Sequence, residues 1–178
     1  QVEASPRNQA VIDAQAQDVL ERVYALARQE GEESWSQIRN EMGDSMEEGC
    51  GIYRTQESME KTVAKIAELK ERYKRIKVKD SSSVFNTDLL YKIELGYILD
   101  VAQSISSSAV ERKESRGAHQ RLDYEERDDV NYLKHTLAFY NADGAPTIKY
   151  SDVKITKSQP AKRVYGAEAE AQEAAKKE

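Results

Sequence analysis

The sequence predicts a mainly α-helical chain: a three- to four-helix bundle followed by a polar crossover segment and a β-hairpin. Three observations favour this fold class. Apolar residues make up 39% of the 178 residues, below the roughly 45–50% of a typical globular chain, so we expect a thin core. Eight glycines and three prolines leave few turns for a many-stranded sheet. An apolar repeat of 3.6 residues runs through most of the first 114 residues, as in amphipathic helices.

Two helices are predicted before residue 52. Asn8 can cap the first helix, and Gly31 closes it. One stripe of this helix is apolar and is expected to be buried: Ile12, Ala16, Val19, Val23 and Leu26. The second helix is shorter and follows Ser34, which has the spacing of a capping box with Gln37. Two glycines end it around residues 49–51. Its apolar stripe consists of Trp35, Ile38, Met42 and Met46.

Two further helices complete the predicted bundle. Thr55 can cap the third. Its stripe consists of Met59, Val63, Ile66, Leu69, Tyr73 and Ile76. Asn86 can cap the fourth and longest, from residue 87 to about 113. The first half of this fourth helix is apolar on most faces, so we expect cover on more than one side. Its apolar residues are Leu89, Leu90, Ile93, Leu95, Tyr97, Ile98, Leu99 and Val101.

The pattern changes after Glu114. Residues 115–131 are dense in charge and have no clear period. Residues 132–140 and 147–155 are predicted to be two strands, and turn residues at 141–144 would join them into a hairpin. We therefore predict three parts: a helical bundle (1–114), a crossover segment with the hairpin (115–165), and a flexible charged tail (166–178).

Composition excludes several classes of function. A net charge of −5 removes any general case for binding nucleic acid, which requires clustered surplus positive charge. The basic side chains between 61 and 79 have glutamate neighbours and are expected to form a solvated face. No apolar run is long enough to insert into a membrane. The single cysteine, Cys50, rules out an internal disulfide. It lies between two glycines, which favours an inert residue at a close approach over a reactive thiol.

The charged segment 111–135 contains both histidines, His119 and His135. One interpretation is a polar site in which His119 acts as acid or base and arginines bind a carboxylate. The other, which the residues favour, is an ion-pair network that positions an irregular segment. Because no third ligand of suitable type lies near the histidines, a metal site is not expected. The residues by themselves predict no self-contained active site.

Several strings resemble a known family: MEEGCGIYRT (46–55), SVFNTDLL (83–90), ESRGAH (114–119), ERDD (126–129), LKHTLAF (133–139) and AKRVYG (161–166). Together they resemble the C-terminal region of the flavoprotein subunit of quinol:fumarate reductase, within the succinate dehydrogenase/fumarate reductase flavoprotein family. The resemblance covers residues 8–165. The ESRGAH string is typical of the wider family, whereas GIYRT and VFNTDLL look more like the fumarate reductase branch.

The resemblance implies an FAD-dependent oxidoreductase that reduces fumarate to succinate with electrons from quinol, in anaerobic respiration and tricarboxylic acid metabolism. In that family FAD is attached covalently to a histidine in an N-terminal domain, and electrons arrive through an iron–sulfur subunit. The complex is held by membrane anchor subunits at the cytoplasmic face of the bacterial inner membrane. The family's FAD fingerprint and catalytic motifs have no counterpart in residues 1–178. We therefore expect no catalytic, cofactor-binding or metal residue here, and an inactive scaffold.

The resemblance also gives the polar segment a candidate role. We expect Arg116, Gly117, His119 and Arg121 to face the FAD-binding domain, with Gly117 allowing close backbone approach or a positive φ. An exposed surface is expected where that domain belongs. Two alternatives stay open: the same region of a succinate dehydrogenase flavoprotein, and a free-standing helical interaction module.

Overall fold

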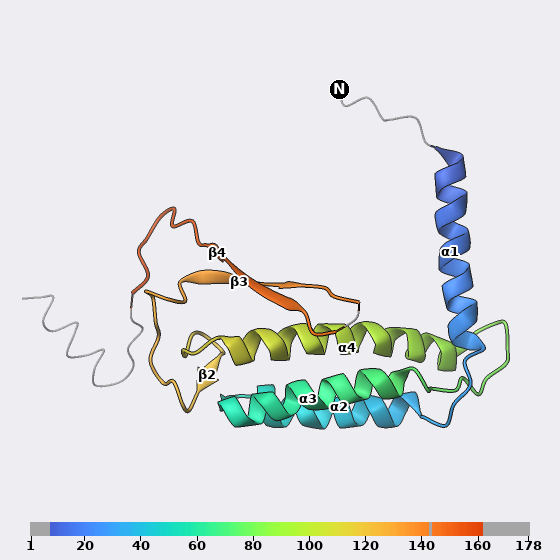
Figure 1. Cartoon of the computed structure of the whole chain (residues 1–178), viewed down its shortest axis with the longest axis horizontal. Helices are drawn as coiled ribbons and strands as arrows, with labels where there is room; N and C mark the ends of the chain where they lie inside the picture. Colours follow the sequence, from blue (N-terminus) through green and yellow to red (C-terminus); the bar gives the residue numbers. More distant parts are fainter. Residues whose placement is uncertain (1–7, 143, 162–178) are drawn as a thin grey trace, which may run out of the picture.

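A computed structural model describes residues 8–142 and 144–161. The fold is mainly helical, as predicted, with four helices and two small two-stranded sheets in this part of the chain (Figure 1). The helices are α1 (Gln9–Ala27), α2 (Trp35–Cys50), α3 (Gln56–Tyr73) and α4 (Thr87–Glu111). The strands are β1 (Tyr53–Arg54), β2 (Gln120–Arg121), β3 (Lys134–Phe139) and β4 (Thr147–Asp152). The predicted tail, 166–178, lies outside the described residues, and the division into three parts stays a prediction.

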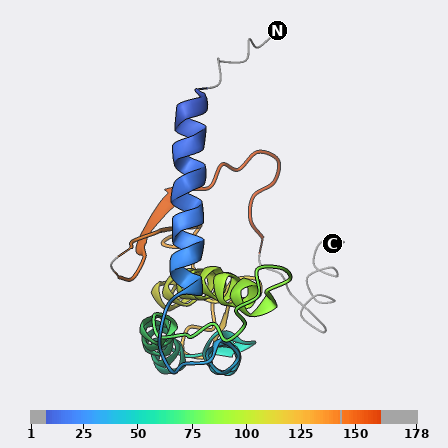
Figure 2. The same ribbon diagram turned by 90° about the vertical axis from the view of Figure 1, so that its right-hand side faces the viewer.

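The core lies among α2, α3 and α4, which run side by side in both views (Figures 1 and 2). Eight buried side chains form it: Ile38, Met42, Ile66, Leu69, Ile76, Leu95, Leu99 and Ala102. A smaller cluster of Cys50, Met59 and Ala109 lies toward the other end of the bundle. The stripes predicted for the second and third helices are therefore confirmed at their central positions.

The buried stripe predicted for the first helix is wrong. None of the residues of α1 is buried, and Val19 is 48% exposed. The physical reason is the direction of the helix: α1 projects steeply from one end of α4 and does not run alongside the other helices (Figures 1 and 2). Only its last turn comes close to the bundle, where the carbonyl of Leu26 accepts a hydrogen bond from Lys92 Nζ at 2.8 Å.

Three of the four predicted helix caps are confirmed. The Asn8 and Asn86 side chains accept hydrogen bonds from the backbone N–H of the third residue on, and Thr55 forms a capping box with Ser58. The capping box predicted between Ser34 and Gln37 is wrong. Ser34 does occupy the N-cap position but makes no side-chain cap bond, because its hydroxyl bonds the hydroxyl of Ser36 at 2.9 Å instead.

Cover over α4 is confirmed only in part. One face of α4 packs on α2 and α3, while α1 and the hairpin touch it elsewhere. Tyr97 and Val101 remain 68% and 57% exposed, on the side of the helix turned away from buried Leu95 and Leu99. An apolar face of α4 is therefore open in the described chain.

The predicted hairpin is confirmed with shorter strands. Strands β3 and β4 pair antiparallel, from Lys134 opposite Asp152 to Phe139 opposite Thr147. A second, unpredicted pairing joins β1 and β2 in parallel, with Tyr53 opposite Gln120 and Arg54 opposite Arg121. Strands of two residues carry no readable alternation, and these two are far apart in the sequence. This pairing places the charged crossover against the α2–α3 junction.

Candidate functional site

The crossover segment folds around a buried carboxylate, that of Glu114. This side chain is fully buried and accepts two hydrogen bonds from Arg116, at 2.8 Å to Nε and 3.0 Å to Nη2. It also pairs with Arg112 and accepts from the backbone N–H of Asp128 at 2.8 Å. The carboxylate of Glu114, together with that of Asp129 at 2.7 Å, raises the pKa of the Arg116 guanidinium. A buried charge is tolerated here because each of its oxygens is paired.

A second ion pair lies beside it. The side chain of Arg121 is fully buried and donates two hydrogen bonds of 2.7 Å to Asp123, in the bidentate geometry that favours arginine. It also donates to Gln56 Oε1 at 2.8 Å and stacks over the ring of Tyr124, 4.9 Å from the ring centre. Hydrogen bonding to Arg121 lowers the pKa of Asp123 to about 2.

Asp123 has a second role at the start of α3. Its Oδ2 accepts from the backbone N–H of Gln56 at 2.8 Å. A carboxylate is favourable there, because the N-terminus of a helix carries partial positive charge. The pair of Arg121 and Asp123 therefore fixes the crossover to the beginning of α3.

His119 links the crossover to β1 and to the end of α4. Arg54 Nη1 lies 3.0 Å from its Nδ1, and the carbonyl oxygen of Arg112 lies 3.0 Å from its Nε2. A guanidinium only donates and a carbonyl only accepts, so Nδ1 is the unprotonated nitrogen and Nε2 carries the hydrogen. Burial is the main cause that lowers the pKa of this imidazole, and the nearby Arg54 lowers it further. His119 is therefore neutral near pH 7, with both ring nitrogens engaged.

Gly117 adopts the positive φ expected of it, at +60°. It lies in a tight turn closed by Arg116 N–H to the His119 carbonyl at 2.9 Å and the reverse bond at 3.0 Å. A side chain added at Gly117 would meet nothing within 4 Å, so no close backbone approach occurs there within the described chain. The turn of residues 117 and 118 is exposed.

The structure thus brings Arg116, His119 and Arg121 into one connected network. Within this chain they form the ion-pair network that was the favoured interpretation of the segment. Four partners were missed from the sequence: Arg54, Gln56, Arg112 and Glu114. The first two arrive through the parallel pairing of β1 with β2, which no local pattern signals. His135 is not part of the network; it lies exposed in β3, opposite Ser151.

Cys50 and the basic side chains of α3 have structural surroundings rather than those of a reactive thiol or a binding patch. Burial raises the pKa of the Cys50 thiol, which makes it unreactive. The basic side chains of α3 have acidic partners, such as Glu41 for Lys65 at 2.8 Å and Asp100 for Lys70 at 2.8 Å. Within residues 8–142 and 144–161, no group of three or more histidine, cysteine, aspartate or glutamate side chains could hold a metal ion. No helix in that part of the chain is both long and apolar enough to cross a bilayer.

Fold and site together define a helical domain whose charged crossover is a structural ion-pair network. Comparison with known proteins makes the assignment specific. Residues 39–165 match the family described as "Fumarate reductase flavoprotein C-term", and the chain belongs to this family.

Relatives within the family are similar in sequence, and the chain matches only part of the length of each. The fumarate reductase flavoprotein subunit of Haemophilus influenzae is 78% identical over 99% of this chain, and that of Escherichia coli K12 is 63% identical over 92%. A succinate dehydrogenase flavoprotein subunit of Rickettsia felis is 35% identical over 91%. The chain spans 29% of the H. influenzae relative and 28% of each of the other two.

Solved structures give the same result. A chain of E. coli quinol fumarate reductase superimposes with a TM-score of 0.87 at 62% identity, covering 92% of this chain and 28% of that one. An adenylylsulfate reductase from Archaeoglobus fulgidus, at 18% identity and a TM-score of 0.69 over 84% of this chain and 26% of that one, shares the fold alone.

Proposed function

We propose that this chain is the C-terminal helical region of a fumarate reductase flavoprotein subunit whose full-length form reduces fumarate to succinate with electrons from quinol. The observation that carries the proposal is the 78% identity to the H. influenzae fumarate reductase subunit, against 35% to a succinate dehydrogenase subunit. The full-length subunit works with an iron–sulfur subunit and membrane anchor subunits at the cytoplasmic face of the bacterial inner membrane. This chain contributes scaffold, and the part that precedes it holds covalent FAD.

No residue of this chain is proposed to bind flavin. Binding of the FAD pyrophosphate favours a helix N-terminus with free backbone N–H groups. At α3 two of these groups are engaged, by Thr55 and Asp123, and at α4 one is engaged by Asn86, whereas Ser34 at the start of α2 makes no side-chain cap bond. His119 has no free ring nitrogen for a covalent link. No catalytic step is therefore assigned to this chain.

The proposed contribution of the crossover is to dock the FAD-binding domain through the surface built by Arg116, Gly117, His119 and Arg121, in which the fully buried Arg121 holds the surface in place and does not touch the partner. Support comes from the exposed turn at Gly117, which the ion pairs on either side hold in a fixed place. A preformed surface of this kind is ordered before the partner arrives, which lowers the entropic cost of association.

Two variants of the full-length subunit test the docking role. Arg116→Ala removes a partner of buried Glu114 as well as part of the proposed surface, whereas Ala118→Asp changes only the exposed turn. We expect both to lower flavin retention and assembly with the iron–sulfur subunit, while Arg39→Ala, at an exposed position of α2, leaves both unchanged. Wild-type flavin content and assembly in Ala118→Asp would contradict the docking role.

The assignment as a reductase scaffold has its own test. Purified full-length subunit should be yellow and reduce fumarate with an artificial electron donor, and the 178-residue chain should do neither. A chain of 178 residues that binds flavin, or that converts fumarate unaided, would overturn the proposal.

A further inference from the structure

A polar groove lies where the C-terminal part of α4 meets strands β1 and β3, beside His119. Its volume is about 390 Å³. Two arginines, one histidine and three hydroxyl side chains form the polar part of its wall: Arg54, Arg112, His119, Ser104, Ser108 and Thr136. The wall that the described residues supply contains no aspartate or glutamate. This groove, which we call the Arg54 groove, is therefore rich in hydrogen-bond donors and poor in acceptors.

The guanidinium of Arg54 carries a positive charge that is not compensated in the groove. Its Nε donates to the carbonyl of Gly51 at 2.8 Å, and its Nη1 lies 3.0 Å from His119 Nδ1. Neither partner is negatively charged, and these bonds use only two of the five N–H groups of an arginine. Arg112 differs, because its guanidinium pairs with the carboxylate of Glu114. One free charge therefore faces the groove.

The effect of this charge is felt at the imidazole of His119. Burial is the main cause that lowers the pKa of His119, and the positive charges of Arg54, Arg121 and Arg112 lower it further. Arg121 and Arg112 each have a carboxylate partner, whereas Arg54 has none among the residues that the structure describes. A positive potential in a concave site attracts anions.

The hydroxyl groups of the wall have hydrogens available for a ligand. Thr136 Oγ1 accepts a hydrogen bond from Arg112 Nη2 at 3.1 Å, so its own hydrogen is free to be donated. Ser104 and Ser108 lie one turn apart on the same face of α4. Within the described chain, neither serine hydroxyl has a hydrogen-bond partner. The groove thus combines one guanidinium with three hydroxyl donors.

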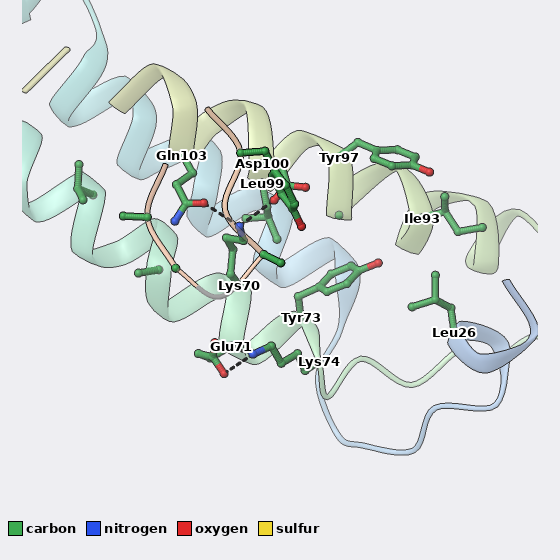
Figure 3. A pocket seen from close by; sticks show the side chains of 17 residues that line it. Leu26, Lys70, Glu71, Tyr73, Lys74, Ile93, Tyr97, Leu99, Asp100 and Gln103 are labelled. Carbon is green, nitrogen blue, oxygen red and sulfur yellow. Dashed lines mark hydrogen bonds and ion pairs between the residues drawn. The ribbon is translucent and has the colours of Figure 1, made fainter. Parts of the chain in front are cut away.

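A larger cavity between α3, α4 and the hairpin lacks this feature. It has a volume of about 630 Å³, and its charged side chains are paired with one another (Figure 3). Lys70 Nζ lies 2.8 Å from Asp100, and Lys74 Nζ lies 2.7 Å from Glu71. Its charges are satisfied within the chain, and none is left to select an ionic ligand. Volume alone therefore does not distinguish the two sites, whereas unpaired donors do.

We propose that the Arg54 groove binds the carboxylate of a small monocarboxylic acid, with Arg54 as the charged partner and Ser108 and Thr136 as further donors. The planar fork of a guanidinium matches a carboxylate. One free positive charge balances one carboxylate, whereas a phosphate dianion or a dicarboxylate would stay partly uncompensated. Ile105 and Ala109 in the same wall suit a short carbon skeleton. The proposal goes beyond the proposed function and does not depend on it.

Fluorine NMR of the full-length subunit, titrated with fluoroacetate, tests the proposal. Ser108→Asp places a carboxylate in the groove, where it should pair with Arg54 and weaken fluoroacetate binding about tenfold or more. Arg54→Lys keeps the charge but loses the fork, and should weaken binding about tenfold. Arg39→Ala, at an exposed position of α2, should bind as wild type does. Binding elsewhere in the subunit is common to all variants and cancels in the comparison.

Competition identifies the chemistry of the ligand. Acetate should displace fluoroacetate from the wild-type subunit, and sulfate at the same ionic strength should not. Flavin content and circular dichroism of each variant verify its fold, and the two variants alter the groove by different means, so misfolding of one leaves the other as the test. The proposal is overturned if the wild-type subunit binds no fluoroacetate, if Ser108→Asp binds it as tightly as wild type, or if sulfate displaces it equally well.

Discussion

The imidazole of His119 gives the chain a pH dependence that can be isolated. Its folded-state pKa lies below its usual value, so the unfolded chain binds the proton more readily. Stability from this residue is therefore present above pH 6.5 and is lost as the pH falls toward the folded-state pKa. Protonation of Nδ1 would also end its acceptance of the hydrogen bond from Arg54.

We expect the difference in free energy of unfolding between wild type and His119→Gln to shrink as the pH falls from 7 to 5. Glutamine keeps one donor and one acceptor but does not titrate. Urea unfolding at three pH values measures this difference. The contributions of the acidic side chains are the same in both proteins and cancel in it. A difference that stays constant over this range would contradict the neutral assignment.

The ammonium group of Lys92 gives the chain a second pH dependence, at alkaline pH. It is fully buried in α4 and donates to the carbonyls of Leu26 at 2.8 Å and Ile76 at 2.7 Å. Desolvation lowers its pKa to about 8, against the raising effect of Asp88. Between pH 8 and 10.5 the unfolded chain holds more protons than the folded chain, so the contribution of Lys92 to stability rises with pH.

Relative to Lys92→Met, wild type should therefore gain stability as the pH rises from 8 to 10.5, by up to about 3 kcal/mol at 1.36 kcal/mol per pKa unit. Unfolding of the two proteins at pH 7.5, 9 and 10.5 measures this gain. A constant difference would mean that Lys92 titrates normally.

Residue positions such as Lys92 show where sequence reasoning stops. The caps at Asn8, Thr55 and Asn86 could be predicted because a cap depends on residues three positions away. A lysine in an apolar helix gives no local sign of burial. The two carbonyls that make its burial tolerable come from chain segments that only tertiary packing brings near.

At the scale of elements, the crossing of α2 and α3 depends on Gly49. A Cβ at this position would lie 2.0 Å from Thr62 Oγ1 and 2.5 Å from the carbonyl oxygen of Ser58. Gly43, in the middle of the same helix, would meet nothing within 4 Å. The two glycines therefore form a matched pair that separates packing from helix propensity.

Gly49→Ala should destabilise the chain by about 1–3 kcal/mol, because the helices must move apart. Gly43→Ala should stabilise it by about 0.5–1 kcal/mol, because alanine is the better helix former and no contact opposes it. Thermal unfolding of both variants gives the two signs. Equal shifts would show that the crossing does not require a glycine at 49.

The buried face of a helix could be predicted where the helices that pack against it belong to the described chain. The stripes of α2 and α3 match the observed core because these helices face each other. The stripe of α1 has the same spacing but is not buried. Periodicity indicates that one face of a helix is apolar, but it does not indicate which segment packs against that face. The pairing of β1 with β2 was missed for the reason that each strand has only two residues.

For the whole molecule, Arg112 joins the helices to the hairpin. It caps α4 and donates to the carbonyl of Tyr132 at 2.8 Å and to that of Lys134 at 2.7 Å. A further bond reaches Thr136 Oγ1 at 3.1 Å, and the guanidinium lies 5.6 Å from the centre of the Tyr132 ring. One side chain thus holds the base of the hairpin against the end of α4.

Removal of this link tests whether the hairpin can unfold separately from the helices, as the predicted division near residue 114 implies. In Arg112→Ala we expect the amides of β3 and β4 to exchange faster while those of α2 and α3 keep wild-type rates. Hydrogen bonds to a charged group contribute about 1.5–3 kcal/mol each, which is enough to lower the opening free energy of the hairpin alone. Arg39→Ala, at an exposed position of α2, is the control. If the helices and the hairpin instead accelerate together, the chain unfolds as one cooperative unit, and the boundary near residue 114 is only a change in sequence character.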